Sequence, residues 1–248
     1  MSLNVIKNPL TQAIKSKDDQ SNYKPDQVFA KDHFLYLLVG RKRSGKSTLA
    51  LNLLDTPEKL GGFKKKFDKI WLVSPTAQYD PKMQELVEEL EPEGQYYDTF
   101  NNEMQYELMQ KIKQFNSGWK NKKRKPHHLV IYDDVLAFLP SNRKKGQFFN
   151  SFMTNQRHFK SSCMIMSQRL NELNPLIRSQ ADIISYFRQD NPKEDKIFSE
   201  TFGVDDSLIK ACTKDPHSFI TANFLHTTPK FYKRFDEIKF GFNSNENN

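Results

Sequence analysis

The sequence contains little cysteine and no long apolar run. Only 2 of its 248 residues are cysteine, too few for a disulfide framework, so we expect a protein of a reducing compartment. No run approaches the roughly 18 apolar residues of a membrane-spanning helix. The N-terminus lacks the apolar core of a signal peptide. These absences predict a protein that has no membrane span and is not secreted.

Negative charge is also in short supply. The 38 Lys and Arg residues outnumber the 30 Asp and Glu residues, which leaves a formal net charge of +8. A basic excess favours a polyanionic partner such as nucleic acid, an anionic membrane or an acidic protein. The densest positive runs lie at residues 64–66, 120–125 and 143–145. They are candidate contacts to nucleic-acid phosphates, or simply solvated surface.

Glycine is scarce, yet two of the 9 glycines fall in one motif of the pattern G-x-x-x-x-G-K-S. It reads Gly40-Arg41-Lys42-Arg43-Ser44-Gly45-Lys46-Ser47-Thr48. An apolar segment precedes it and a helix-favouring segment follows it. Glycine lets backbone N–H groups close around phosphates, and a helix N-terminus favours an anion. The motif predicts a P-loop that binds ATP, with Lys46 on the β- and γ-phosphates and Ser47 on Mg²⁺.

A second apolar strand, residues 129–132, ends in two acids, which is the pattern of a Walker B strand. Asp133, at the end of the strand, would hold Mg²⁺ directly or through water. Asp134 faces the other way and would polarise the attacking water as a general base. The preceding pair, His127 and His128, hints at a metal, but no further ligand is suitably spaced, so we expect no zinc role.

Two more strand ends carry polar residues. Residues 162–167 form a buried strand that closes at Gln168. A polar side chain at the tip of the strand beside Walker B can contact both the γ-phosphate and the attacking water. Gln168 is therefore a candidate sensor, and the alternative is an ordinary loop glutamine. The strand at residues 70–73 ends at Ser74 and Pro75, where polar groups can face the same side of the site.

The order of elements predicts an α/β fold with a mostly parallel sheet between two helix layers. A strand inserted between the P-loop and Walker B strands, for which residues 70–73 are the candidate, and a second acid indicate a RecA-like, additional-strand P-loop NTPase. Other expected helices cover residues 81–90, 104–115, 147–157, 192–201 and 205–213. Other expected strands cover residues 95–100 and 183–187, and residues 218–224 and 230–232 should form a C-terminal hairpin.

Composition divides the chain into three parts. We expect a polar N-terminal arm over residues 1–30, an ATPase domain over residues 31–240, and a disordered tail over residues 241–248. The tail is predicted from its run of asparagine and other polar residues.

Several motifs together give a resemblance to a known family. Besides the P-loop and the two acids, they are the strand end at residues 72–76, Arg157-His158 before the strand that ends at Gln168, and the Pro-x-x-Arg element from Pro175 to Arg178. On these motifs, over about residues 33–190, the chain resembles the poxvirus-type genome-packaging ATPases of the FtsK–HerA superfamily. Members occur in large DNA viruses and virophages.

The resemblance implies an ATP-hydrolysing motor that moves double-stranded DNA, whatever its sequence, into a preformed capsid. It implies a homo-oligomeric ring of five or six subunits at a capsid vertex or portal component, in the virion or in a viral factory of the host cytoplasm. It further implies an arginine that reaches the γ-phosphate of a neighbouring subunit. Arg157 and Arg178 are the candidates, and Arg41 or Arg43 would be the alternative within the same subunit.

Two other functions fit the same motifs. The first is a P-loop phosphotransferase that acts on a small molecule. The second is a nucleotide-dependent assembly protein whose ATP is structural. Stimulation of ATP hydrolysis by double-stranded DNA distinguishes the motor from both.

Overall fold

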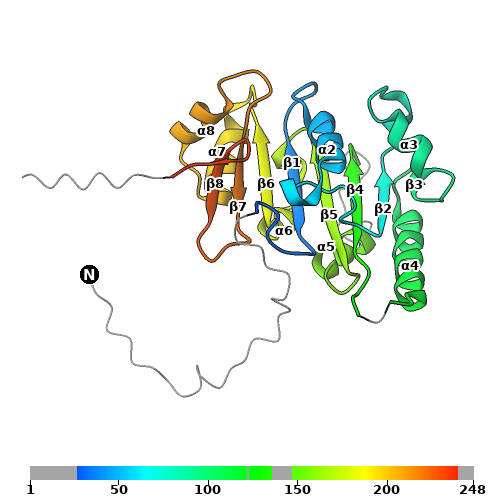
Figure 1. The fold of residues 1–248 in the computed structure, drawn as a ribbon. Helices are drawn as coiled ribbons and strands as arrows, with labels where there is room; N and C mark the ends of the chain where they lie inside the picture. The colour runs from blue at the N-terminus through cyan, green and yellow to red at the C-terminus, as the bar shows by residue number, and fades with distance from the viewer. Residues whose placement is uncertain (1–26, 122, 136–146, 240–248) are drawn as a thin grey trace, which may run out of the picture.

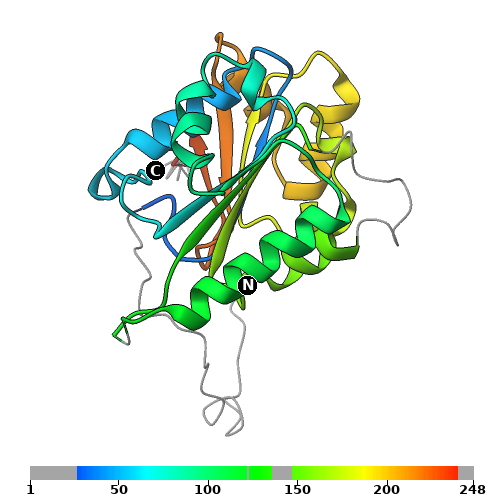
Figure 2. The same ribbon diagram turned by 90° about the vertical axis from the view of Figure 1, so that its right-hand side faces the viewer.

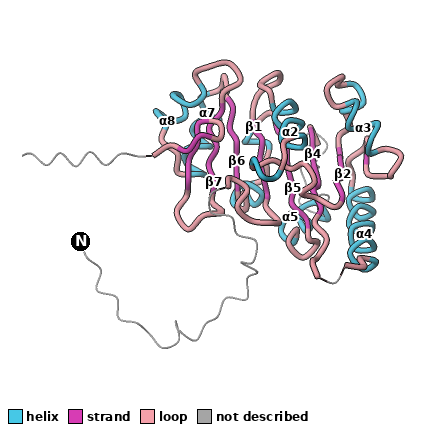
Figure 3. Tube along the Cα trace, viewed as in Figure 1, coloured by secondary structure: helices cyan, strands magenta, loops and turns pink. Residues whose placement is uncertain are grey.

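One large sheet forms the centre of the molecule. The structure, a computed structural model, describes residues 27–121, 123–135 and 147–239. Within these ranges nine strands pair in the order β3-β2-β4-β5-β1-β6-β7-β8-β9 (Figures 1 and 3). Their bounds are β1 Leu35–Val39, β2 Lys69–Val73, β3 Tyr96–Tyr97, β4 His128–Asp133, β5 Ser161–Ser167, β6 Ile183–Phe187, β7 Phe219–Asn223, β8 Lys230–Lys233 and β9 Asp236–Glu237.

The six strands β1 to β6, which are neighbours in the sheet, are all parallel to one another. Strands β7, β8 and β9 are antiparallel to their neighbours. The mostly parallel sheet and the C-terminal hairpin of β7 and β8 are therefore confirmed. Hydroxyl groups tie this hairpin to the centre of the sheet. The Oγ of Ser185 lies 2.7 Å from the hydroxyl of Tyr36 on β1 and 2.7 Å from that of Thr221 on β7, and all three residues are buried.

Helices cover both faces of the sheet (Figure 2), which confirms the three-layer αβα arrangement. On β1, Leu35 and Leu37 pack into one core cluster while Tyr36 and Leu38 pack into the other. One face carries α2 (Lys46–Asp55) and α3 (Gln84–Leu90). The other carries α4 (Asn102–Gly118), α5 (Gln147–Asn155), α6 (Pro175–Ser179), α7 (Pro192–Phe202) and α8 (Asp206–Thr213). None of the helices in the described ranges is both long and apolar enough for a membrane span.

The strand that separates β1 from β4 is β5. The additional-strand arrangement is present, but the prediction that residues 70–73 supply the inserted strand is wrong. That segment is β2 and lies on the far side of β4. Order along the chain is not order across the sheet, because a crossover helix lets a later strand return to the position beside β1.

Three other predicted boundaries shift for local reasons. Helix α3 begins at Gln84 instead of residue 81, because the Asp80 carboxylate accepts the Lys82 N–H in a turn. Helix α4 begins earlier than residue 104, because the Asn101 side chain caps the helix by accepting the Met104 N–H. The strand predicted over residues 95–100 is only the two-residue β3.

The packed unit begins before residue 31. Phe29, assigned to the polar arm from the sequence, is 2% exposed, and its ring lies 5.1, 5.2 and 4.6 Å from those of Phe34, Tyr36 and Phe63. Ala30 is fully buried. The rest of the predicted arm, residues 1–26, and the predicted tail lie outside the described residues.

The two histidines at the amino end of β4 are buried hydrogen-bonding groups. His128 accepts the Trp71 indole N–H at Nδ1 (3.3 Å), and its Nε2 lies 2.9 Å from the side-chain amide oxygen Oδ1 of Asn116, so the neutral ring with hydrogen on Nε2 satisfies both. His127 Nε2 lies 2.9 Å from the Ser162 hydroxyl. Burial lowers the pKa of His127 to about 2 and that of His128 to about 4, from 6.5.

This burial predicts a loss of stability in acid. Below pH 6.5 the unfolded chain takes up protons at these rings while the folded chain keeps them neutral, so the free energy of unfolding falls as the pH falls. We expect His127→Gln to reduce the change in unfolding free energy between pH 7 and pH 5 by about 1–2 kcal/mol. Denaturant titration at both pH values measures this change.

The wild type, titrated with denaturant at the same two pH values, is the reference. An equal pH dependence in His127→Gln and the wild type would contradict the buried, neutral state of His127.

Candidate functional site

Strand register gathers the predicted motifs at one edge of the sheet. Val39 at the end of β1 pairs with Ser167 at the end of β5, and Asp133 at the end of β4 pairs with Met166. The P-loop, the two acids and Gln168 each follow directly on one of these strand ends. The carboxyl edge of a parallel sheet is where such folds bind ligands.

The P-loop adopts a conformation that its glycines permit. Gly45 has φ 108° and serves as the N-cap of α2. A Cβ on Gly40 would lie 2.7 Å from the Cβ of Phe187 on β6, so only glycine fits there. Lys46 Nζ donates to the carbonyl oxygens of Gly40 (2.6 Å) and Arg41 (3.1 Å), which keeps its ammonium group over the loop.

Asp133 lies on the face of the sheet that carries α2. The residues of β4 alternate between the two core clusters, and Leu129 and Ile131 fall on the α2 side, so Asp133 falls there too. Its carboxylate accepts the Ser74 hydroxyl at 3.1 Å. Burial and the neighbouring Asp134 raise the pKa of Asp133 from 3.8 to about 6, although Lys46 opposes the shift. Burial likewise lowers the pKa of Lys46, and the two carboxylates act against that change.

Asp134 turns away from the strand direction at a left-handed backbone angle, φ 50°. Such angles are uncommon outside glycine and are concentrated at functional sites. Gln168 Nε2 lies 3.2 Å from both carboxylate oxygens of Asp134 and donates to them. The structure therefore brings the predicted general base and the predicted sensor into direct contact.

The arginine candidates divide into two groups. Arg41, in the P-loop, forms an ion pair with Asp190 beyond the end of β6, and Arg43 is exposed at φ 64°. Arg157 pairs with Asp182 at 3.4 Å, and Asp182 in turn accepts the Leu35 N–H at the amino end of β1.

Arg178 precedes Asp182 by four residues. Arg157 and Arg178, the two outer arginines, therefore lie toward the edge of the sheet opposite the P-loop. Figure 1 shows α6, which carries Arg178, beside the beginning of β1. The structure does not bring Arg157 or Arg178 into the site of their own subunit. Their predicted contact with a neighbouring subunit stays a prediction.

The P-loop also has two neighbours that the sequence did not predict. Lys82 Nζ, from the loop after β2, donates to the Thr48 hydroxyl at 3.2 Å. His217 Nδ1, from the turn between α8 and β7, lies 3.1 Å from the Ser44 carbonyl oxygen. The position of Lys82 after a strand end was a usable signal. His217 gave none, because its contact joins residues 173 positions apart.

The structure describes some of the basic runs of the sequence and not others. Arg124 forms a two-pronged ion pair with Asp68, at 2.8 and 2.6 Å, at the amino end of the sheet. That part of the run at residues 120–125 lies at the edge of the sheet opposite the P-loop. Residues 143–145 lie outside the described residues.

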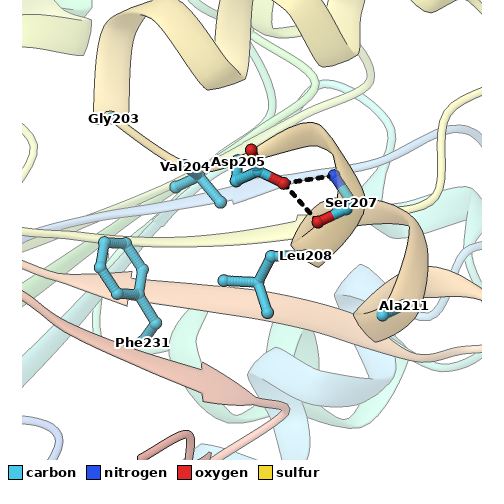
Figure 4. A pocket seen from close by; sticks show the side chains of 7 residues that line it. All are labelled: Gly203, Val204, Asp205, Ser207, Leu208, Ala211 and Phe231. Atoms are coloured by element: carbon cyan, nitrogen blue, oxygen red, sulfur yellow. Dashed lines mark hydrogen bonds between the residues drawn. The ribbon is translucent and has the colours of Figure 1, made fainter. Parts of the chain in front are cut away.

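A surface hollow of about 420 Å³ lies away from the P-loop, between the start of α8 and β8 (Figure 4). Leu208 and Phe231 face each other across it, and the N-cap Asp205 accepts the Ser207 N–H at its rim. Its lining is Gly203, Val204, Asp205, Ser207, Leu208, Ala211 and Phe231. It contains none of the P-loop or Walker B residues, so we assign the nucleotide site to the carboxyl edge of the sheet.

Solved structures share this fold. The DNA-packaging ATPase B204 of Sulfolobus turreted icosahedral virus aligns with a TM-score of 0.58 at 19% identity, over 80% of this chain and 96% of that one. The genome-packaging NTPase B204 of Sulfolobus turreted icosahedral virus 2, in complex with AMPPCP, aligns with a TM-score of 0.56 at 20% identity, over 81% and 96%. No curated protein sequence matches significantly.

The sequence itself matches a family described as Poxvirus A32 protein over residues 20–197. The matched segment includes the P-loop, both acids, Gln168 and the two outer arginines. It confirms the resemblance inferred from the motifs, and this chain belongs to the poxvirus A32 protein family.

Proposed function

We propose that this protein is an ATP-hydrolysing motor that translocates double-stranded DNA into a viral capsid. The observation that carries the proposal is the contact of Gln168 with Asp134, beside Asp133 and the P-loop, at one edge of the sheet. Membership of the poxvirus A32 family and the fold of viral packaging ATPases support the choice of a packaging motor.

The P-loop residues 40–48 bind the triphosphate of ATP. Lys46 exchanges its two backbone carbonyl contacts for the β- and γ-phosphates, which are stronger partners for an ammonium group. The N-terminus of α2 and the loop N–H groups favour the same anion.

The residues beside the P-loop fit Mg²⁺. A hydroxyl from Ser47 and a carboxylate from Asp133 are the oxygen ligands that this ion takes. Burial and the charge of Asp134 raise the pKa of Asp133, and Lys46 offsets only part of that rise. Ser47 and Asp133 would hold this ion, and its positive charge would offset the negative charge that develops on the phosphates. Ser74, hydrogen-bonded to Asp133, orients that carboxylate.

Asp134 accepts a proton from the attacking water, as a general base. Gln168 orients its carboxylate, and the same amide can contact the γ-phosphate, so Gln168 couples the base to the state of the nucleotide. The cationic side chain that stabilises the negative charge of the transition state would be Arg41 or Arg43 of the same subunit. The alternative is Arg157 or Arg178 of a neighbouring subunit. The outer pair acts only in an oligomer, because it lies away from its own P-loop.

The proposed motor works as a ring of five or six subunits at a capsid vertex or portal, in the virion or the infected-cell cytoplasm. It contacts DNA through lysine and arginine on phosphates, so binding does not depend on sequence. The net charge of +8 supports a polyanionic partner.

The first test of this function removes the general base. Asp134→Asn should lower ATP hydrolysis at least about 100-fold, since a positioned base contributes that much or more, while ATP binding persists because the P-loop is unchanged. Phosphate release and ATP titration measure the two effects. Asp98→Asn, an exposed acid near the same edge, is the control and should hydrolyse ATP like the wild type. Normal turnover in Asp134→Asn would remove Asp134 from the role of base.

The second test adds DNA. We expect double-stranded DNA of any sequence to stimulate ATP hydrolysis, and the stimulation to fall steeply between about 50 and 200 mM salt because phosphate contacts release counterions. A steady-state phosphate-release assay with two unrelated DNA duplexes measures this. Phosphate transfer to a small molecule, without a DNA effect, would favour the phosphotransferase. Retained ATP without phosphate release in the presence of DNA would favour the structural nucleotide of an assembly protein.

A further inference from the structure

The turn between α8 and β7 supports the P-loop from outside. His217 Nδ1 lies 3.1 Å from the carbonyl oxygen of Ser44, and a Cβ on Gly45 would lie 3.5 Å from the same nitrogen. This histidine lies beyond residues 20–197, which the family match covers. It belongs to neither Walker motif.

The chemistry of the contact fixes the proton on the imidazole ring. A carbonyl oxygen can only accept a hydrogen bond, so Nδ1 must carry the hydrogen and donate it. Both the neutral ring with hydrogen on Nδ1 and the protonated ring satisfy this condition. The contact is therefore a hydrogen bond from His217 to the backbone of the P-loop.

That bond sets the orientation of one peptide group. The Ser44–Gly45 peptide is planar and trans, so its C=O and its N–H point in opposite directions. When His217 holds the carbonyl on the outside of the loop, the Gly45 N–H is directed away from the histidine. A P-loop binds phosphates through inward N–H groups, so the bond favours the orientation that anion binding requires.

The backbone around this peptide needs such support. Arg43 has φ 64° and Gly45 has φ 108°, so left-handed residues flank Ser44 on both sides. A left-handed angle at a residue other than glycine persists only when the surroundings impose it. His217 is itself left-handed, with φ 58°, so the turn that supplies the support also carries strain.

Contacts outside the P-loop hold His217 in position. The next residue, Ser218, donates its N–H and its hydroxyl to the Asp215 carbonyl at 3.2 and 2.6 Å, and Lys233 on β8 pairs with the Asp215 carboxylate at 3.4 Å. Phe219, at the start of β7, has its ring 4.7 Å from that of Phe187, which packs against Gly40. The C-terminal hairpin therefore fixes the turn independently of bound nucleotide.

We propose that His217 is a positioning residue that preorganises the P-loop for phosphate binding through the Ser44 carbonyl. The inference rests on the proposed nucleotide site but not on DNA translocation. It specifies the ligand group concerned, which is the polyphosphate and not the nucleoside.

Two substitutions separate the hydrogen bond from the backbone angle. His217→Gly removes the donor and accepts the positive φ without strain. His217→Asn keeps an N–H donor near the position of Nδ1 and also tolerates a left-handed angle. Lys214→Ala, in the same exposed turn, is the control. Binding of ATP and of inorganic triphosphate, each with Mg²⁺, is measured by titration, alongside kcat at saturating ATP and the melting temperature without ligand.

We expect His217→Gly to weaken the binding of ATP and of inorganic triphosphate equally, by about tenfold, as for the loss of one hydrogen bond. The kcat at saturating ATP should stay within about threefold of the wild-type value. Losing an interaction that is equally strong in the ground state and the transition state raises KM and leaves kcat unchanged. His217→Asn should recover most of the affinity, and Lys214→Ala should match the wild type.

Three results would overturn the inference. The first is an unchanged affinity for both ligands in His217→Gly, and the second is a weaker affinity for ATP with an unchanged affinity for inorganic triphosphate. The third is no recovery of affinity in His217→Asn when both variants melt like the wild type. The second result would assign His217 to the nucleoside instead. A failure of the wild type to bind either ligand would count against the nucleotide site itself, which distinguishes the two failures.

Discussion

The parallel register of β1, β5 and β4 is the constraint on which the site depends. It aligns Val39 with Ser167 and Met166 with Asp133, so three functional segments begin at the same height of the sheet. Because side chains alternate along a strand, a shift of β4 by one residue would turn Asp133 from the α2 face to the opposite face. Residues buried on both faces resist such a shift, and β1 and most of β4 are fully buried. Core packing therefore determines the positions of Asp133 and Asp134.

Charge is crowded where these strands end. Two carboxylates and one ammonium group share a half-buried edge, and the charge of Asp134 adds to the burial that disfavours the ionised form of Asp133. The raised pKa of Asp133 and the lowered pKa of Lys46 have the same origin, since burial penalises both charged forms. In the proposed complex, an anionic triphosphate would pair with Lys46 and a divalent cation would pair with Asp133. The charges of Asp133 and Lys46 at this edge therefore favour the proposed nucleotide complex over the free protein.

Sequence patterns located the site because its chemistry is encoded locally. The P-loop, Asp133, Asp134 and Gln168 each follow an apolar run, and the end of a strand can be recognised without knowing its neighbours. The order of strands could not be predicted in the same way, and the inserted strand was assigned to residues 70–73 when it is β5. Phe29 was missed because its polar surroundings outweighed one aromatic residue. His217 was missed because only the tertiary fold brings it to Ser44.

The C-terminal strands belong to the nucleotide-binding unit in a physical sense. The hydroxyl groups of Tyr36, Ser185 and Thr221 connect β1 to β7 through the buried sheet, and the Phe187–Phe219 ring contact joins β6 to β7 beside Gly40. The P-loop strand is therefore joined through buried contacts to strands that include the exposed Lys233. A motor must convert the state of a phosphate site into movement at a distant surface, and a rigid, continuous sheet is a physical route for that conversion. In this chain the sheet extends from the strand before the phosphate-binding loop to β8, which carries Lys230 and Lys233, without a break.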